Sequence, residues 1–354
     1  MNFSQQILEW YGKNKRSLPW RNSKNPYKIW LSEIILQQTK VAQGLPFYNK
    51  FILAFPTIND LANATENEVL NLWQGLGYYS RARNMHFTAK EIAERYNGIF
   101  PNDYKTILKL KGIGTYTAAA ISSFVFNLPF AVVDGNVIRL LSRYFGIPTA
   151  FDSAKGKKEF QLLAQKLLIK KTAAEYNQAI MEFGALQCVP KSPNCSVCPL
   201  QNSCFAFNNN LLSDFPKKKK KIKIRKRYFE FLIISENKKI LIQKRENGIW
   251  KGLYQFPLIE NMEEKSEKEI CNSKDWENLF KGVAANIIKI SPRIKHQLTH
   301  QTIFAQFWHI DSKIPANKNT ISIQKKVLKH YPIPKLLEKY LEKIGMIYVF
   351  YYIC

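Results

Sequence analysis

Residues 188–204 read CVPKSPNCSVCPLQNSC, a stretch that gathers four of the six cysteines of the chain: Cys188, Cys195, Cys198 and Cys204. Six, two and five residues separate successive cysteines. Four thiolates in one small loop system form the ligand set of an iron-sulfur cluster. Zinc is the alternative, although zinc modules usually carry two close-spaced cysteine pairs and only one such pair occurs here. The stretch therefore predicts a ligand loop for one of these two groups.

Composition indicates a two-domain globular protein with a polyanionic partner. The chain has 354 residues, of which 46% are hydrophobic, so it can bury sizeable cores. Its formal net charge of +26 exceeds what solubility needs, and lysines near phosphates gain free energy by releasing condensed counterions. Nucleic acid is therefore the leading partner class, and a lysine-rich solvated surface is the plainer interpretation.

The ends of the chain and the remaining cysteines bear on its location. The N-terminal stretch MNFSQQILEWYGKNKR lacks the apolar core of a signal peptide, and no apolar run reaches the roughly 18 residues that cross a membrane. We therefore expect a cytoplasmic protein without membrane attachment. Disulfides are rare in that compartment, so packing is the default role for Cys271 and Cys354.

The hydrophobic pattern divides the chain into an α part and an α/β part. From Phe3 to about Phe207, apolar residues recur at three- and four-residue spacings, which is typical of helices. Residues 217–227, KKKKKIKIRKR, hold nine cations and no acid, which predicts an extended linker. From Tyr228 onward, YFEFLIIS and KILIQKR predict a β-hairpin. We expect three parts: a helical domain over 1–208, a basic linker over 209–227 and an α/β domain over 228–354.

Residues 103–126, DYKTILKLKGIGTYTAAAISSFVF, predict two helical segments around a tight turn. Gly112 and Gly114 allow the turn and leave backbone N–H groups free to face a phosphate at the start of the second helix. On these residues alone, a plain helix-turn-helix corner is the simpler interpretation.

Two acidic residues stand in settings that shift their protonation in opposite directions. Glu33 lies in an apolar helical segment, one turn from Trp30 and Gln37, where desolvation raises a carboxyl pKa and keeps a general acid protonated. A salt-bridged glutamate is an equal alternative. Asp134 closes an apolar run before a helix, where an N-cap is its simplest role and the electropositive helix start favours its charged form. An acid paired with an anion is the pattern that breaks glycosidic bonds.

Two motifs resemble the endonuclease III superfamily of DNA glycosylases. The cysteine spacing of 188–204 is similar to that of the superfamily's cluster loop, and this resemblance implies a [4Fe-4S] cluster rather than zinc. The string LKGIGTYTAAAI resembles its helix-hairpin-helix, which implies that Gly112 and Gly114 bind the DNA backbone without reading sequence.

Strings along most of the chain resemble the adenine DNA glycosylase (MutY) family. They occur in the family's order: LPWR at 18–21, WLSEIILQQT at 30–39, GLGYYSRARN at 75–84, VVDGNVIRL at 132–140 and MEFGALQC at 181–188. The resemblance implies a base excision repair enzyme that hydrolyses the N-glycosidic bond of adenine opposite 8-oxoguanine or guanine in double-stranded DNA. We expect a monomer that works at the nucleoid.

The same resemblance assigns the reaction to three residues. It implies that Glu33 protonates the departing adenine and then activates water, and that Asp134 stabilises or captures the oxocarbenium-like sugar. Tyr116 stands where bifunctional relatives carry a Schiff-base lysine, which predicts a monofunctional enzyme with Tyr116 near the sugar. Two alternatives remain: a bifunctional pyrimidine glycosylase and lyase, and a non-catalytic iron-sulfur protein that binds DNA. A packing role is the alternative for Tyr116.

Further residues are assigned by the resemblance to the adenine pocket and to the lesion. Trp20, Arg21 and Gln178 match positions that line the adenine pocket. Four others match residues that surround or wedge the lesion pair, with ordinary core or surface roles as the alternative: Gln38, Thr39, Leu76 and Tyr78.

The C-terminal part resembles the MutT (Nudix)-like domain that is fused to this family. WKGLYQFP at 250–257 is similar to the strand and loop that follow its first hairpin. MEEKSEKEI at 262–270 lacks the pattern of a Nudix box, which makes nucleotide hydrolysis unexpected. In the family this domain helps to recognise 8-oxoguanine, partly through a Phe-Ser-His tip. Here the tip reads Leu298-Thr299-His300, which implies lesion contacts by Thr299 and His300.

Overall fold

The computed structural model describes residues 2–219, 224–313 and 319–346. The chain divides into two compact units. The helical unit consists of Met1–Asn63 and Asn84–Lys221, and the sheet unit consists of Ala64–Arg83 and Ile222–Cys354. In the described ranges, none of the helices is long and apolar enough to cross a membrane.

This division differs from the predicted one in two places. Residues 64–83, expected in the helical domain, group with the sheet unit, and the first strand already begins at Arg225. The first half of the predicted linker is packed rather than extended. Phe215 is only 6% exposed, and the Lys219 N–H donates to the Asp152 carboxylate at 2.8 Å. An apolar anchor and backbone hydrogen bonds thus outweigh charge repulsion there, while residues 220–223 of the linker lie outside the described ranges.

The helical unit is built from short helices joined by tight turns. They are α1 (Phe3–Asn14), α2 (Pro26–Leu36), α3 (Val41–Ala54), α4 (Ile58–Asn63), α6 (Ser80–Arg95), α7 (Tyr104–Lys109), α8 (Thr115–Phe126), α9 (Gly135–Phe145), α10 (Ala154–Leu167), α11 (Ala173–Leu186) and α12 (Phe205–Asn208), with 3₁₀ turns at Lys170–Thr172, Gln201–Ser203 and Leu212–Asp214. The division between the units falls inside α6. Side chains cap several N-termini: the Asn25 carboxamide accepts from Lys28 N–H, and the Asp103 carboxylate accepts from Thr106 N–H.

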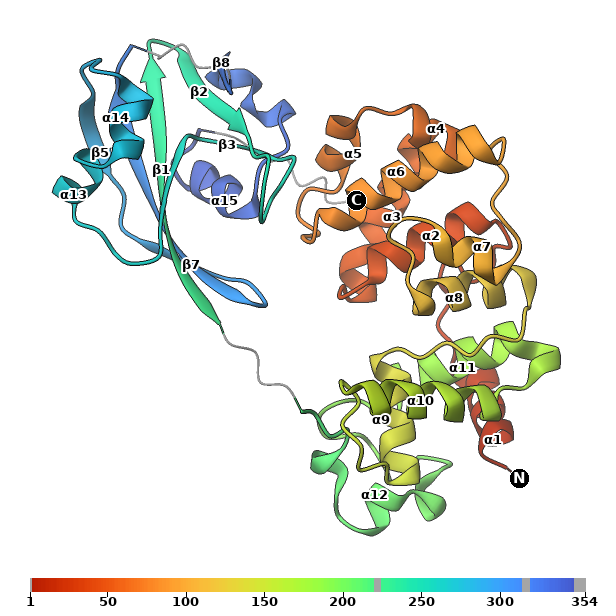
Figure 1. Cartoon of the computed structure of the whole chain (residues 1–354). Helices are drawn as coiled ribbons and strands as arrows, with labels where there is room; N and C mark the ends of the chain where they lie inside the picture. The colour runs from red at the N-terminus through yellow and green to blue at the C-terminus, as the bar shows by residue number, and fades with distance from the viewer. Residues whose placement is uncertain (1, 220–223, 314–318, 347–354) are drawn as a thin grey trace. The chain divides into compact units, whose positions relative to one another are not determined.

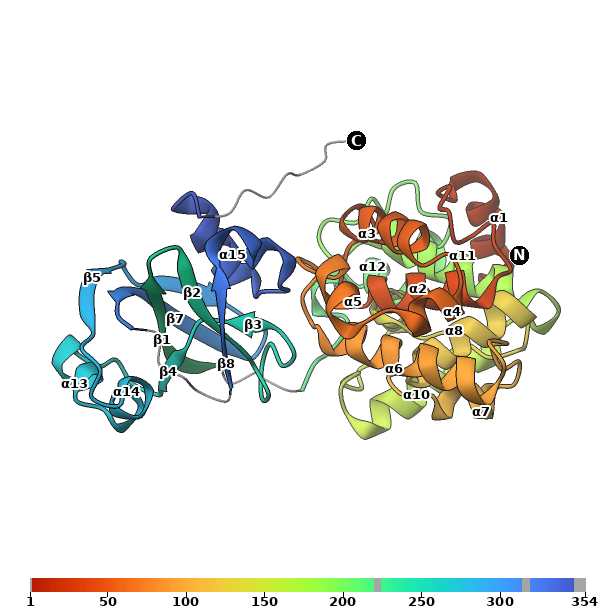
Figure 2. The ribbon, with the colours of Figure 1, turned by 90° about the horizontal axis from the view of Figure 1, so that it is seen from above.

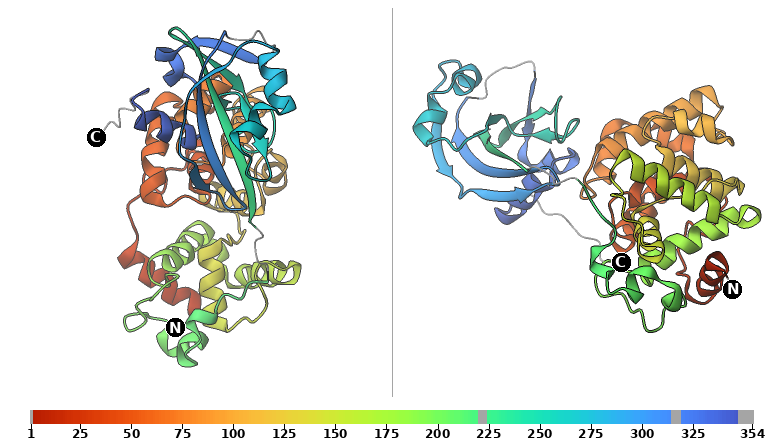
Figure 3. Two further views of the ribbon diagram at one scale, coloured as in Figure 1. Left: turned by 90° about the vertical axis from the view of Figure 1, so that its left-hand side faces the viewer. Right: turned by 60° about the horizontal axis from the view of Figure 1, so that its bottom comes forward.

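These helices form two groups (Figures 1 and 3). One contains α2, α3, α4, α6, α7 and α8, and the other joins α1 to α9, α10, α11 and α12. The second group encloses a core that includes Ile7, Leu141 and Phe183, so the N-terminal helix packs against segments more than a hundred residues away. Ile29 of α2 and Ala120 of α8 share a smaller core. The helix-hairpin-helix formed by α7 and α8 belongs to the first group.

The sheet unit contains one mixed eight-stranded sheet. Its elements are α5 (Glu66–Leu72), β1 (Arg225–Glu236), β2 (Lys239–Lys244), β3 (Tyr254–Gln255), β4 (Leu258–Asn261), α13 (Glu267–Cys271), α14 (Lys274–Phe280), β5 (Asn286–Ile290), β6 (Ile294–Gln297), β7 (Gln301–Asp311), β8 (Thr320–Gln324), a 3₁₀ turn at Lys325–His330 and α15 (Lys335–Lys343). The central order is β3-β2-β1-β7-β5. β1 and β7 run parallel from the pair Arg225–Gln301 to the pair Ser235–Asp311.

Alternate residues of β1 enter two cores on opposite faces of this sheet. Phe231 and Ile233 pack with Leu337 and other residues of α15, whereas Leu232 packs with Phe280 of α14. Figure 2 shows α15 on one face of the sheet and α13 with α14 on the other. The two-residue period of the strand thus sorts its side chains into a three-layer α/β/α arrangement. The predicted combination of an α domain with an α/β domain is confirmed.

Candidate functional site

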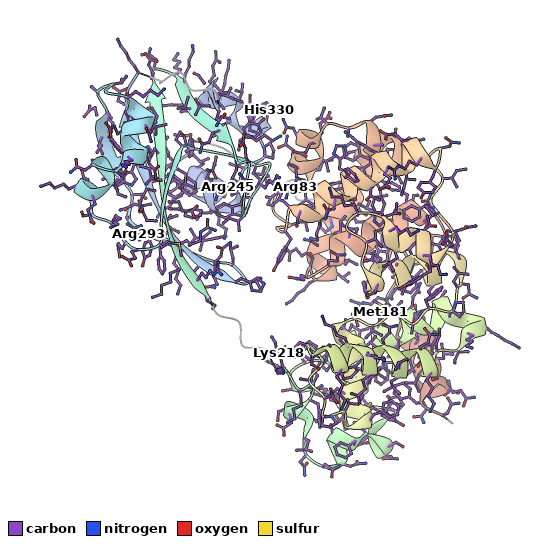
Figure 4. All side chains as sticks on the ribbon, in the orientation of Figure 1. Arg83, Met181, Lys218, Arg245, Arg293 and His330 are labelled. Atoms are coloured by element: carbon purple, nitrogen blue, oxygen red, sulfur yellow. The ribbon has the colours of Figure 1, made fainter. Side chains whose placement is uncertain are left out.

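A cavity of about 1080 Å³ opens within the helical unit. Its walls come from both helix groups: α2, the hairpin turn before α8, the start of α9, and α11, on which Figure 4 labels the lining residue Met181. Nine of the predicted site residues line it: Trp20, Arg21, Glu33, Gln38, Thr39, Gly114, Tyr116, Asp134 and Gln178. The fold therefore gathers residues that are spread over most of the helical sequence.

Glu33 occupies the inner side of the buried helix α2. Glu33 is 7% exposed, and the Tyr116 hydroxyl donates to its Oε2 at 2.8 Å. Burial raises the pKa of Glu33 to about 7, nearby Asp134 adds to this, and the Tyr116 hydrogen bond lowers it by less. A large fraction of Glu33 therefore carries a proton at neutral pH, as a general acid requires.

Asp134 is the N-cap of α9. Its Oδ1 accepts from the Val137 N–H at 2.8 Å, and its Oδ2 accepts from the Asn136 amide at 2.7 Å. Burial raises the pKa of Asp134, and these hydrogen bonds and Arg139 oppose that rise. The helix start does lower this pKa as predicted, but the predicted net shift toward the charged form is wrong, because desolvation is the larger effect. Asp134 accepts hydrogen bonds from two N–H donors, whereas Glu33 accepts one from a phenol. Since such bonds stabilise a carboxylate, the surroundings favour the charged form more at Asp134 than at Glu33.

Tyr116 lies in the first turn of α8 beside both carboxyl groups. Burial raises the pKa of its phenol well above the ordinary value, and the negative charges of Glu33 and Asp134 add to the shift. The phenol therefore stays neutral and acts as a hydrogen-bond donor to Glu33. A packing role alone does not describe this residue.

An ion-pair cluster that the sequence analysis missed lies in the wall of the cavity. Glu182 of α11 is 1% exposed, and its carboxylate accepts from Arg21 at 2.7 and 2.8 Å and from Arg16 at 2.5 and 2.8 Å. Burial alone would raise the pKa of Glu182, but the hydrogen bonds from Arg16 and Arg21 outweigh it and lower the pKa to about 2. Glu182 was visible in the quoted string MEFGALQC, and the apolar residues around it were the available signal.

Trp20 and Gln178 lie in the wall near this cluster. The Trp20 ring packs edge-on against Tyr48, with centroids 5.1 Å apart. The Gln178 Oε1 accepts from the Tyr11 hydroxyl at 2.9 Å. Both residues line the cavity.

The hairpin turn has the geometry that a phosphate site needs. Gly112 has φ +80°, and a Cβ there would lie 2.7 Å from the Cβ of Asn84, so a larger residue would be both strained and crowded. Gly114 is the N-cap of α8 and has open space where a Cβ would stand. The backbone N–H groups at the start of α8 are thereby accessible to an anion.

Gln38 and Thr39 follow the C-terminus of α2 at the mouth of the cavity. Gln38 adopts a left-handed conformation with φ +55°. The Thr39 hydroxyl donates to the Gln37 carbonyl oxygen at 3.2 Å. Strained polar residues at a cavity rim are common at binding sites.

The sheet unit brings two of the predicted lesion residues together. The hydroxyl groups of Tyr78 and Thr299 are hydrogen-bonded to each other. Tyr78 is 45% exposed with φ +48°, whereas Leu76 is buried at 6% exposure. His300 lies exposed in the β6–β7 turn, and its backbone carbonyl accepts from the Arg225 N–H. Leu298 packs against the sheet core rather than projecting from the turn.

The four clustered cysteines line one small cavity beside α9. Arg143 holds the start of their loop by donating to the backbone carbonyls of Val189 and Pro190 at 2.8 and 3.0 Å and to the Cys188 sulfur at 3.5 Å. Burial raises the pKa of the Cys198 thiol to about 11, and its three partner cysteines add to the shift. The loop is therefore preformed around its sulfur atoms.

The four sulfurs share one cavity, and Arg143 holds the loop that carries them. Within the described ranges, no group of three or more His, Cys, Asp or Glu side chains is arranged as a site for a metal ion. Four thiolates from one loop suit an iron-sulfur cluster and also a zinc ion.

Two family models match the chain. Residues 31–168 match the HhH-GPD superfamily of base excision DNA repair proteins, and residues 230–343 match the NUDIX domain. Within the second match, α13 has five residues, and Glu269 forms a capping box with Ser266.

Relatives and solved structures agree with these matches. The chain is 41% identical over 326 residues to the adenine DNA glycosylase of Buchnera aphidicola subsp. Baizongia pistaciae, which covers 90% of this chain and 88% of that protein. A thermostable thymine-DNA glycosylase is similar in structure, with a TM-score of 0.55, 29% identity, and coverage of 58% of this chain and 95% of that one. Endonuclease III in a non-covalent DNA complex shares the fold, with a TM-score of 0.50, 23% identity, and coverage of 60% and 99%.

Replacing Glu33 by glutamine should stabilise the protein more at pH 8 than at pH 6. The folded pKa of about 7 exceeds the ordinary 4.5, so the stability that this carboxyl contributes is present below pH 4.5 and is lost as pH rises to about 7. Glutamine does not ionise. The free energy of unfolding of the variant, relative to that of the wild-type protein, should therefore increase by about 1 kcal/mol from pH 6 to pH 8. Urea denaturation of both proteins measures this. Glu9→Gln, at an exposed site of α1, is the control, and an equal effect at both pH values contradicts the assignment.

Proposed function

The chain belongs to the adenine DNA glycosylase family, and we propose that it removes adenine from 8-oxoguanine:adenine and guanine:adenine mispairs with Glu33 as the proton donor. It is a DNA glycosylase of base excision repair, and its partner is DNA. One observation carries the proposal: a buried glutamate with a pKa of about 7 lies beside Asp134 and under the Tyr116 hydroxyl in a cavity that can accept an extruded base.

The reaction follows from the two carboxyl groups. Protonated Glu33 donates to a ring nitrogen of adenine as the bond to C1′ breaks, and the electron pair of that bond leaves with the base. The Asp134 carboxylate stabilises the positive charge that develops at C1′. Water then adds to C1′ and gives its proton to Glu33. The products are free adenine and an abasic site, and Glu33 is again protonated.

Tyr116 makes the enzyme monofunctional. Its phenol offers no amine to form a Schiff base with the sugar, so the strand is not cut by this route. Its hydrogen bond fixes Glu33 Oε2, which leaves Oε1 free to face the base. We therefore regard Tyr116 as a positioning residue as well as a neighbour of the sugar.

The remaining predicted residues hold the DNA. Gly112 and Gly114 present backbone N–H groups to a phosphate, while Gln38 and Thr39 stand at the cavity rim toward the duplex. In the sheet unit, the hydroxyls of Tyr78 and Thr299 offer paired polar contacts to 8-oxoguanine, and exposed His300 lies next to Thr299. Leu76 is the weaker wedge candidate because it is buried, so we assign that role to Tyr78.

The cysteine loop is proposed to hold a [4Fe-4S] cluster through Cys188, Cys195, Cys198 and Cys204. A bound cluster would crosslink the loop and supply structural order rather than an open metal site. Arg143 fixes the loop from α9. We propose that the protein acts as a monomer, because residues for base removal and for lesion contact all come from one chain.

Glu33→Gln should lower the rate constant for adenine release by at least about a hundredfold, because the proton donor is lost. Single-turnover cleavage of an 8-oxoguanine:adenine duplex, with alkali added only afterwards, measures it. Glu9→Gln should match the wild-type protein. Unchanged release by Glu33→Gln contradicts the acid role, and strand breakage before alkali or borohydride trapping of a covalent adduct contradicts the monofunctional reaction.

Anaerobically purified protein should contain about four iron atoms and four sulfides per chain, as a four-thiolate cluster requires. Cys198→Ser should lose most of both, because one attachment is removed. Cys271→Ser is the matched control, since this cysteine packs in the sheet unit and should leave the iron content unchanged. Zinc in place of iron and sulfide in the wild-type protein contradicts the assignment.

Thr299→Val should lower the preference for 8-oxoguanine over guanine opposite adenine by about five- to tenfold, since one hydrogen bond of about 1 kcal/mol is lost. Tyr78→Phe should have a similar effect. In the double variant, the free energy of preference that is lost should be smaller than the sum of the two single losses, because the two hydroxyls contact each other. The readout is the ratio of rate constants on the two duplexes, with Ser322→Ala on β8 as the control. An unchanged ratio in both single variants contradicts the recognition role.

A further inference from the structure

A second cavity lies next to the catalytic one in the helical unit. It has a volume of about 370 Å³ and shares Arg16, Arg21 and Gln178 with the larger cavity. We call it the rear cavity. Its other polar walls come from the end of α1, the following loop and the start of α11, with Lys15, Asn22 and Glu175 among them. The two cavities are therefore adjacent and divided by side chains.

The dividing wall consists of polar side chains on separate backbone segments. Arg16 and Arg21 reach from the loop after α1 to Glu182 on α11. Gln178, one turn before Glu182 on the same helix, is tied to Tyr11 of α1. The Arg16 side chain is 35% exposed, so it borders solvent as well as both cavities. Passage from one cavity to the other would require these side chains to rotate, and rotation of Arg16 would break its hydrogen bonds to Glu182.

The hairpin residues do not belong to the shared wall. Gly114, Tyr116 and Gln38, which we assign to DNA, line only the catalytic cavity, whereas Arg16 and Arg21 line both cavities and pair with Glu182 of α11. After the glycosidic bond breaks, the abasic DNA would still lie against the hairpin. A free base that crossed the shared wall would then leave without passing the hairpin.

The rear cavity offers hydrogen-bond partners to a neutral purine within a mostly cationic wall, which includes Lys15, Arg16, Arg21 and Lys24. Adenine has ring nitrogens that accept hydrogen bonds, and Lys15, Asn22 and the Gln178 amide supply donors. Its amino group donates, and the exposed Glu175 carboxylate at the start of α11 can accept. Tyr11 adds an aromatic ring, with the Lys15 ammonium and the Arg21 guanidinium 5.7 and 5.8 Å from its centroid.

We propose that the rear cavity is a subsite for the adenine base after excision, and that the base leaves through it while the abasic DNA is still bound. The subsite rests on the proposed function, because that reaction supplies the base. It also assigns Arg16 and Gln178 a role in product exit in addition to lining the pocket.

The test follows radiolabelled adenine from an 8-oxoguanine:adenine duplex during a single turnover of the full-length protein. Rapid gel filtration separates free adenine from the protein–DNA complex. In the wild-type protein, adenine should leave well before the abasic strand. Ala174→Trp, which fills the rear cavity from α11, should slow adenine departure at least tenfold with the excision rate constant within twofold of wild type. Ala154→Trp, at an exposed site of α10, should change neither quantity.

Two results overturn the subsite: adenine that stays until the DNA dissociates in the wild-type protein, or equal adenine departure in Ala174→Trp and the wild type. A further measurement needs no bulky variant. In equilibrium dialysis, free adenine should bind to the complex with a duplex that carries a stable abasic analogue, and Glu175→Gln should weaken that binding. Absence of binding also overturns the subsite. Failure of the wild-type protein to excise adenine is a different result, because it overturns the proposed function itself.

Discussion

The burial of the Glu33 carboxyl is the constraint on which the rest of the site depends. An ionised carboxylate is expensive to bury, so a buried one either finds a cation or keeps its proton. Glu33 has a phenol as its hydrogen-bond partner, and its pKa rises to about 7. In another wall of the same cavity, Glu182 meets two guanidinium groups, and its pKa falls to about 2. Two glutamates on neighbouring walls thus acquire opposite chemistry from their partners.

The packing of four helices maintains this contrast. α8 contacts both α2 and α11, which brings Tyr116 to Glu33 and sets the N-terminus of α9 beside them. Asp134 is therefore both a structural cap and a reactive carboxylate, since the hydrogen bonds that begin α9 also stabilise its charge. From the same helix, Arg143 fixes the cysteine loop. Loss of order in that loop would therefore remove hydrogen bonds that hold Arg143 of α9.

Much of this arrangement was readable in the sequence. The cysteine spacing, the glycines of the hairpin and the setting of Glu33 each have a local physical meaning, and the family resemblance placed them in one enzyme. The Asp134 cap was also predicted, although the direction of its pKa shift was not. Burial depends on the helices that cover a residue, whereas an N-cap depends on its own segment.

Features made by distant segments were not predicted. Arg16, Arg21 and Glu182 meet across more than a hundred and sixty positions of the chain, and no local spacing signals such a contact. The packed part of the linker was missed because a single apolar residue, Phe215, anchors it within a strongly basic stretch. The contact between Tyr78 and Thr299 likewise depends on tertiary structure.

The pH dependence of adenine excision tests the central claim most directly. In single turnovers of the wild-type protein on an 8-oxoguanine:adenine duplex, the rate constant should fall as pH rises through about 7, because Glu33 loses the proton that it donates. Duplex binding, measured in parallel, should separate this loss from weaker association. A rate constant that stays level or increases from pH 6 to pH 9 would contradict the account.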